Sequence, residues 1–460
     1  MKEMRPGHIV LFIFCCFVIL GALVFVGDRY RPMLGDLRCP HWEWPLVSSQ
    51  DSVFSGQDSE EQTLAPLELA DSTSLAEEIQ SNGDAALNDA NDDAPLTSET
   101  MSLAESVEPV GVLDYFIAGL LEVGEKQVRV VHYGDSQIEE DRITSTLRDH
   151  LQAQYGGLGP GLLPLVQSIP TRTVIQSLYI NGQRVTAKNG PQRWFVYGPK
   201  SQRRDDDSHY GVMGQVAVLD SLCDSVTVHI EPYGKLTSSS YFNQIRVLAT
   251  NNILVNGSRH HEKTLRDTLK RTNIDICGNG EVYGVSLESP TGVIVDNIPM
   301  RGGSGTVFTK INKKQLSDFY EQTNTRLIIL QFGGNVMPWA NTEGRVIGYA
   351  NSMRRQIQYL KECAPNASIL FIGPSDMLTT VNGEKTSYPT IALMDQQLSR
   401  VAALEGIAYW SLFQAMGGEG SMQTWQEKGL AASDGVHFHR SGANRAGELL
   451  WGWLKLKIDN

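Results

Sequence analysis

A serine, an asparagine and a histidine lie in three short polar clusters that are far apart in the chain. The first cluster, Gly134-Asp135-Ser136, directly follows the apolar run at residues 128–133. A serine hydroxyl beside the free N–H groups at the start of a helix suits a nucleophile whose reaction creates an oxyanion. Asp and Ser are also common helix caps, so this cluster alone fits either role.

The second cluster, Phe332-Gly333-Gly334-Asn335, follows another apolar run. The amide of Asn335 can donate two N–H groups without carrying a charge. An amide donor aimed at a developing oxyanion contributes about 2.7–4 kcal/mol to catalysis. A turn is the alternative interpretation of this glycine-rich segment.

The third cluster, Asp434-Gly435-Val436-His437, lies near the C-terminus. His437 can act as a general base, and Asp434 can fix its tautomer and stabilise the imidazolium. An incidental histidine in a surface loop is the alternative. Taken together, the three clusters predict a serine nucleophile, an amide donor and a histidine–aspartate pair in one acyl-transfer site.

The elements around these clusters alternate between strand and helix. Strand–turn–helix units begin near residues 128, 326 and 368, a short strand follows at 407–410, and a helix near 441–456 closes the chain. This alternation predicts a parallel sheet with helices on both faces. Ligands of such sheets bind beyond the carboxyl ends of the strands, where Ser136 and Asn335 fall.

Residues 165–298 interrupt this alternation with short Val-, Ile- and Thr-rich strands, including one at 292–295. We therefore predict a β-sandwich inserted between the first and second strand–helix units. The sequence alone does not decide whether Cys223 and Cys277 form a disulfide. Five aromatic residues of the insert fit either core packing or stacking on sugar rings: Trp194, Tyr197, Tyr210, Tyr233 and Tyr241.

The three clusters together resemble blocks I, III and V of the SGNH (GDSL-like) hydrolases, over residues 128–160 and 292–455. The resemblance implies a flavodoxin-like, three-layer α/β hydrolase domain, formed here by residues 111–164 and 299–460. Block II of that superfamily supplies a glycine N–H, and we assign Gly302 to this role, with Gly303 as the alternative. Gln137 departs from the Leu or His that is common after the block I serine.

The chain also resembles the peptidoglycan O-acetylesterases, which carry a carbohydrate-binding-like β domain between blocks I and II. The resemblance implies that Ser136 is the nucleophile, His437 the base and Asp434 its orienting partner. The oxyanion would be held by the N–H groups of Ser136 and Gly302 and by the Asn335 amide. We expect a serine esterase that removes O-acetyl groups from a cell-envelope glycan, with peptidoglycan as the first candidate.

Two other functions fit the same motifs. One is an O-acetyltransferase that acts on the same class of polysaccharide, and the other is a non-catalytic glycan-binding protein. We expect no metal and no cofactor. His261-Glu262 lacks the second histidine of a zinc-binding helix, and the glycine-rich run at 302–305 lacks the lysine of a phosphate-binding loop.

Residues 9–27 are nineteen uncharged, mostly apolar residues, which is long enough to span a bilayer as a helix. The apolar segment of a cleaved signal peptide is shorter and precedes a small-residue cleavage site. We therefore predict a single-pass membrane anchor in residues 1–30. The folded part would lie outside the cytoplasm, on the periplasmic side of an inner membrane.

Acidic residues are concentrated in one segment. Residues 48–109 contain fifteen Asp or Glu and no Lys or Arg, so removing them changes the net charge from −13 to +2. A highly charged segment with few aromatic residues cannot form a core, and we predict a flexible linker at 31–110. The remaining charge indicates no basic surface for nucleic acid.

Overall fold

The computed structural model describes residues 111–459, apart from 187–188, 199, 205–208 and 221–225. The predicted membrane anchor and the acidic linker lie outside the described residues, and so does Cys223. Within the described part of the chain, no helix is both long enough and apolar enough to cross a bilayer.

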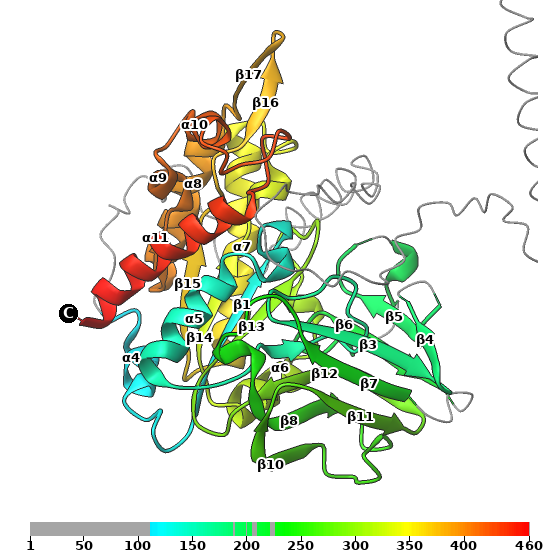
Figure 1. The fold of residues 1–460 in the computed structure, drawn as a ribbon. Coiled ribbons are helices and arrows are strands. Elements are labelled where there is room, and N and C mark those ends of the chain that lie inside the picture. Colours follow the sequence, from blue (N-terminus) through cyan, green and yellow to red (C-terminus); the bar gives the residue numbers. More distant parts are fainter. Residues whose placement is uncertain (1–110, 187–188, 199, 205–208, 221–225, 460) are drawn as a thin grey trace, which may run out of the picture. The chain divides into compact units, whose positions relative to one another are not determined.

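Five parallel strands form the central sheet (Figure 1). In spatial order they are β13 (Gly292–Pro299), β1 (Gln127–Gly134), β14 (Thr325–Gln331), β15 (Ser368–Ile372) and β18 (Ala408–Trp410). The first strand of the chain therefore lies between the second and the third, which is the strand order of flavodoxin-like sheets. The predicted parallel α/β fold is confirmed.

Helices cover both faces of the sheet, because successive strand residues point to opposite sides. In β1, Val128 and Val130 join one core, and Val131 and Tyr133 join the other. The first core is covered by α4 (Asp114–Leu120), α5 (Thr144–Tyr155), α9 (Leu412–Met416), α10 (Ser421–Glu427) and α11 (Arg440–Asp459). The second is covered by α6 (Lys313–Gln322), α7 (Glu343–Cys363) and α8 (Ile391–Glu405).

Strand β13 corrects one part of our sequence interpretation. We assigned its residues to the inserted sandwich at 165–298, but β13 pairs in parallel with β1 along its whole length. Val293, Ile294 and Val295 are all fully buried. A continuous apolar run without alternation is typical of a parallel strand that is covered on both faces.

The insert consists of two antiparallel sheets whose apolar side chains share one core, as the predicted sandwich requires. One sheet has the order β4-β3-β7-β11-β9, and the other has the order β10-β8-β12-β6-β5, with β2 also pairing β12. Their bounds are β2 (Gly161–Leu163), β3 (Val174–Ile180), β4 (Gln183–Val185), β5 (Gln192–Phe195), β6 (Gln215–Leu219), β7 (Val226–Pro232), β8 (Phe242–Ala249), β9 (Leu254–Val255), β10 (Glu262–Leu269), β11 (Thr272–Cys277) and β12 (Gly280–Glu288). Strand β2 precedes residue 165, so this sheet also recruits a segment that we assigned to the hydrolase domain.

A largely buried ionic network joins the insert to the parallel sheet. Arg129 of β1 donates to both carboxylate oxygens of Asp296 on β13, at 2.7 and 2.9 Å, and to Glu288 at the end of β12. Arg246 of β8 donates to the other oxygen of Glu288 at 3.2 Å. Burial alone would raise the pKa of Glu288, but Arg129 and Arg246 lower it to about 2.

The segment after Ser136 does not form the one continuous helix that a strand–turn–helix unit implies. A 3-10 helix, η2 (Ser136–Asp141), ends before α5 begins. At this junction Glu140, Asp141 and Ile143 have positive φ angles, a backbone conformation that residues other than glycine rarely adopt. Arg148 stabilises this turn, because its guanidinium binds both oxygens of Asp141 at 2.5 and 2.9 Å.

Candidate active site

The predicted site residues lie where the strand order of the sheet reverses, between β1 and β14. Gly134, the last residue of β1, pairs with Gln331, the last residue of β14. The chain therefore leaves both strands at the same edge, and this brings Ser136 and Asn335 to one pocket. In open α/β sheets this crevice is the usual ligand site.

Ser136, His437 and Asp434 form a chain of hydrogen bonds. The Ser136 Oγ lies 2.8 Å from the His437 Nε2, and the His437 Nδ1 lies 2.8 Å from the Asp434 Oδ2. An ionised carboxylate can only accept a hydrogen bond, so Nδ1 carries the proton. The Nε2 lone pair then faces the serine hydroxyl, which is the tautomer that a general base requires.

Asp434 also shapes the loop that carries His437. Its second oxygen, Oδ1, accepts the backbone N–H groups of Val436 and His437, at 2.8 and 3.0 Å. Partial burial raises the pKa of the carboxyl, but these N–H groups and the imidazole lower it to about 2. Asp434 therefore stays ionised at neutral pH, as its orienting role requires.

A small hairpin supports the same loop from outside. It consists of β16 (Leu378–Val381) and β17 (Glu384–Ser387), and we did not predict it. The Leu378 N–H donates to the Gly435 carbonyl at 2.8 Å, and the Lys385 Nζ donates to the Ser433 carbonyl at 3.1 Å. The hairpin therefore fixes the backbone on both sides of Asp434.

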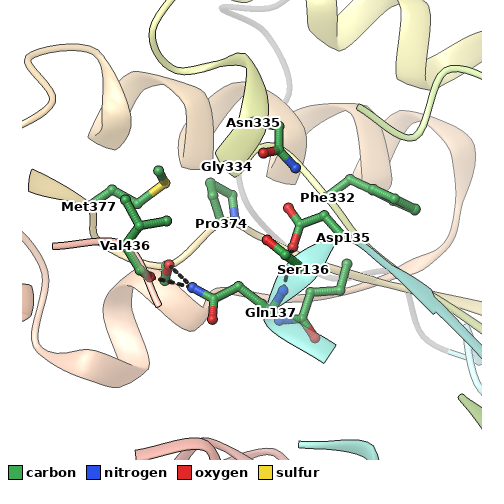
Figure 2. Close-up of a pocket in the computed structure, with 11 residues that line it drawn as sticks. Asp135, Ser136, Gln137, Phe332, Gly334, Asn335, Pro374, Met377 and Val436 are labelled. Carbon is green, nitrogen blue, oxygen red and sulfur yellow. Dashed lines mark hydrogen bonds between the residues drawn. The ribbon is translucent and has the colours of Figure 1, made fainter. Parts of the chain in front are cut away.

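Asn335 follows β14 in the short 3-10 helix η6 (Gly334–Val336). Gly333 begins this turn with a φ of 120°, a conformation that is open in practice only to glycine. The Asn335 side chain lines the pocket, and Figure 2 shows it across the pocket from Ser136. One Nδ2 hydrogen binds the Gly303 carbonyl at 3.1 Å, and the amide group has a second one to offer.

The two glycine candidates differ in the use of their N–H groups. The Gly303 N–H donates to the Met300 carbonyl at 2.7 Å, which closes a tight turn. Gly302 has a φ of 71° in that turn. Because the N–H of Gly303 is already bonded, Gly302 remains the better candidate. Neither glycine is among the residues that line the pocket around Ser136.

The pocket also contains residues that the motifs did not predict. Its wall is completed by Gln331 at the end of β14 and by Pro374, Ser375 and Met377 after β15. The sequence could have indicated the residues after β15, because they directly follow a buried strand and therefore fall at the same edge of the sheet as Ser136.

Two neighbours of the serine have their own contacts in the pocket (Figure 2). The Asp135 Oδ1 accepts the Gln137 N–H at 2.9 Å, and burial raises the pKa of this carboxyl to about 6. The Gln137 side chain donates to the Val436 carbonyl at 2.5 Å, which ties the serine turn to the histidine loop. The residue that departs from the SGNH pattern thus contacts the loop of the predicted base.

The aromatic residues of the insert do not form one surface. Tyr210 is buried, and Trp194 and Tyr197 are partly buried against the core between the sheet and α6–α8. Tyr233 is exposed. Core packing, one of the two uses we left open, is therefore the role of Tyr210, Trp194 and Tyr197.

The sequence matches no family model and no curated protein. Among solved structures, a peptidoglycan O-acetylesterase aligns with a TM-score of 0.60 at 22% identity, over 76% of this chain and 97% of that protein. The acetyl xylan esterase AlAXEase and a putative arylesterase from Agrobacterium tumefaciens align at 13% and 16% identity. Each covers 35% of this chain, and 81% and 79% of those proteins, with TM-scores of 0.27 and 0.26. The chain therefore shares its overall fold with a peptidoglycan O-acetylesterase.

Proposed function

We propose that this protein is a serine esterase that removes O-acetyl groups from a cell-envelope glycan, with peptidoglycan as the first candidate. The observation that carries the proposal is the hydrogen-bonded chain Ser136–His437–Asp434 in a pocket that also contains the Asn335 amide. These are the groups that acyl transfer needs, and all of them lie at the carboxyl edge of the sheet.

The reaction proceeds through an acyl-enzyme. The His437 Nε2 takes the hydroxyl proton as the Ser136 Oγ attacks the ester carbonyl, and the negative charge moves to the carbonyl oxygen. The Asn335 amide and the N–H groups of Ser136 and Gly302 stabilise this oxyanion. His437 then gives its proton to the departing sugar oxygen, and water, activated by the same imidazole, releases acetate.

The choice of substrate is supported by the fold. A peptidoglycan O-acetylesterase aligns over 97% of its own length and 76% of this chain. A membrane anchor at residues 1–30 and an acidic linker at 31–110 would hold the enzyme at the cell envelope, where this polymer lies. Transfer of the acetyl group to a sugar hydroxyl would use the same acyl-enzyme, with the sugar replacing water.

The test is acetate release from O-acetylated peptidoglycan by the full-length protein in detergent. Ser136→Ala removes the nucleophile, and Ser433→Ala is the matched control, because it deletes an exposed hydroxyl next to Asp434. We expect the parent and the control to release acetate at similar rates and Ser136→Ala to be nearly inactive.

The other outcomes identify other functions. Equal release by Ser136→Ala would exclude this serine as the nucleophile. Transfer of acetyl groups to added glycan without free acetate would identify an O-acetyltransferase. Binding of the glycan without either reaction would identify a non-catalytic binding protein.

A further inference from the structure

Three arginines from distant parts of the sequence meet beside the candidate active site. Arg142 follows η2, Arg172 precedes β3 in the insert, and Arg440 is the first residue of α11. The Arg172 Nη1 donates to the Asn444 Oδ1 on α11. Arg440 and Asn444 are four residues apart in this helix, so the guanidinium of Arg172 lies on the helix face that carries Arg440.

Helix packing brings Arg142 to the same place. Helix α11 crosses the beginning of α5 so closely that a Cβ atom on Gly447 would lie 3.0 Å from the Ile143 carbonyl oxygen and 2.6 Å from the Thr146 Cβ. Figure 1 shows the two helices side by side. Arg142 directly precedes Ile143, so its backbone lies beside this part of α11.

The positive charge of this cluster is only partly balanced. Arg142 pairs with Glu140 at 3.3 Å, and both oxygens of Asp141 are bound by Arg148. Within the described residues, no carboxylate lies at salt-bridge distance from Arg172 or Arg440. Glu140 and Asp141 are therefore engaged by Arg142 and Arg148, and neither pairs directly with Arg172 or Arg440.

The environment of Arg172 disfavours its positive charge. Burial lowers the pKa of Arg172, and the nearby charges of Arg440 and Arg142 lower it further, whereas Asp141 and Glu140 act in the opposite direction. Arg440 also stands at the N-terminus of α11, where the helix dipole disfavours a cation. A bound anion would relieve both effects.

Two members of the cluster are close in the sequence to the reacting groups. Arg440 comes three residues after His437, so their Cα atoms are at most about 11 Å apart. Arg142 directly follows the 3-10 helix that begins at Ser136. An anionic group on a substrate whose ester occupies the pocket would therefore lie near this cluster.

We propose that Arg142, Arg172 and Arg440 bind a carboxylate carried by the substrate, so that the enzyme selects acidic acetylated glycans over neutral ones. The planar guanidinium group can bind a carboxylate through two parallel hydrogen bonds, and this gives orientation as well as affinity. The inference rests on the proposed esterase function and adds the charge of the substrate to it. This carboxylate is carried either by a sugar or by a peptide of the substrate.

The test compares the double variant Arg172→Gln/Arg440→Gln with the parent in the full-length protein. Arg184→Gln, changed at an arginine on β4 that donates to Ser177, is the control for loss of a surface charge. The substrates are O-acetylated peptidoglycan, the same polymer with its carboxyl groups amidated, its glycan strands stripped of peptide, and neutral 4-nitrophenyl acetate.

We expect the double variant to raise KM for O-acetylated peptidoglycan about tenfold or more while kcat changes less than about twofold. Hydrolysis of 4-nitrophenyl acetate and of the amidated polymer should not distinguish the double variant from the parent. A KM effect that persists on peptide-free strands identifies a sugar-borne carboxylate, and one that disappears identifies a peptide-borne one. An unchanged KM, or an equal loss on the neutral ester, would overturn the proposal.

If the parent releases acetate from none of these esters, the proposed function fails and the arginine site is tested by binding. Calorimetry would then measure the affinity of the parent and of the double variant for peptidoglycan fragments without acetyl groups. Salt-sensitive binding that the double variant loses would support the site. Equal binding by both proteins, or binding by neither, would overturn it.

Discussion

The carboxyl of Asp135 should make the stability of this protein depend on pH, and Asp135→Asn should remove that dependence. The carboxyl is 5% exposed, and burial raises its pKa from the ordinary value of 3.8 to about 6. A group whose pKa is raised in the folded state favours folding while it is protonated. Its ionisation therefore costs stability as the pH rises through the folded-state value.

The magnitude follows from the shift. A pKa shift of about two units corresponds to a loss of about 3 kcal/mol in the free energy of unfolding. This loss accumulates at about 1.4 kcal/mol per pH unit between pH 4 and 6 and is constant above pH 6. Asn keeps an oxygen that can accept the Gln137 N–H and carries no charge. The free energy of unfolding of Asp135→Asn should therefore exceed that of the parent by an amount that grows over this range.

Urea unfolding followed by tryptophan fluorescence at each pH unit from 4 to 8 measures this difference. Asp267→Asn is the control, because Asp267 is exposed on β10 and its substitution should leave the two pH profiles parallel. A constant difference between Asp135→Asn and the parent would refute the reasoning, since it would mean that the Asp135 carboxyl titrates normally in the folded protein.

Three further substitutions have distinct expected effects. Asp434→Asn should lower kcat for ester hydrolysis by about three to four orders of magnitude, because His437 then loses the partner that sets its tautomer. A loss of less than tenfold in steady-state assays would contradict the triad. Arg129→Met should lower the free energy of unfolding by about 3–5 kcal/mol, because it leaves the Asp296 carboxylate buried without its cation. A urea denaturation curve that matches that of the parent would argue against this network. Gly159→Ala should also destabilise the fold. Gly159 has a φ of 92°, and the added Cβ would lie 2.0 Å from a backbone oxygen. An unchanged melting temperature would show that this turn relaxes freely.

The catalytic clusters could be predicted from the sequence because each is a short contiguous segment at the end of a strong strand signal. Ser136 and Asn335 follow apolar runs that form β1 and β14, and the parallel pairing of these strands brings the segments together. The pairing of Asp434 with His437 spans only three residues, so its geometry is local. These features need no knowledge of distant contacts.

The features that the sequence did not reveal depend on distant contacts. Arg129 lies 167 residues from Asp296 and 159 from Glu288, so nothing local shows that these charges are buried together. Strand β13 was misassigned because short apolar runs in a sandwich and in a parallel sheet have the same composition. The break after η2 is the local exception, because the ion pair that accompanies its unfavourable backbone angles joins Asp141 and Arg148, only seven residues apart.

The position of His437 is set by several contacts from outside the triad. The Ala432 N–H donates to the His437 carbonyl at 2.8 Å, the β16–β17 hairpin binds the carbonyls of Ser433 and Gly435, and Gln137 binds that of Val436. These contacts thus hold the carbonyl groups of four of the five residues from Ser433 to His437. A base that is already oriented needs little rearrangement as charge develops on the substrate. Since Gln137 reaches this loop from the residue next to Ser136, the nucleophile and the base are fixed to each other and not only to the sheet.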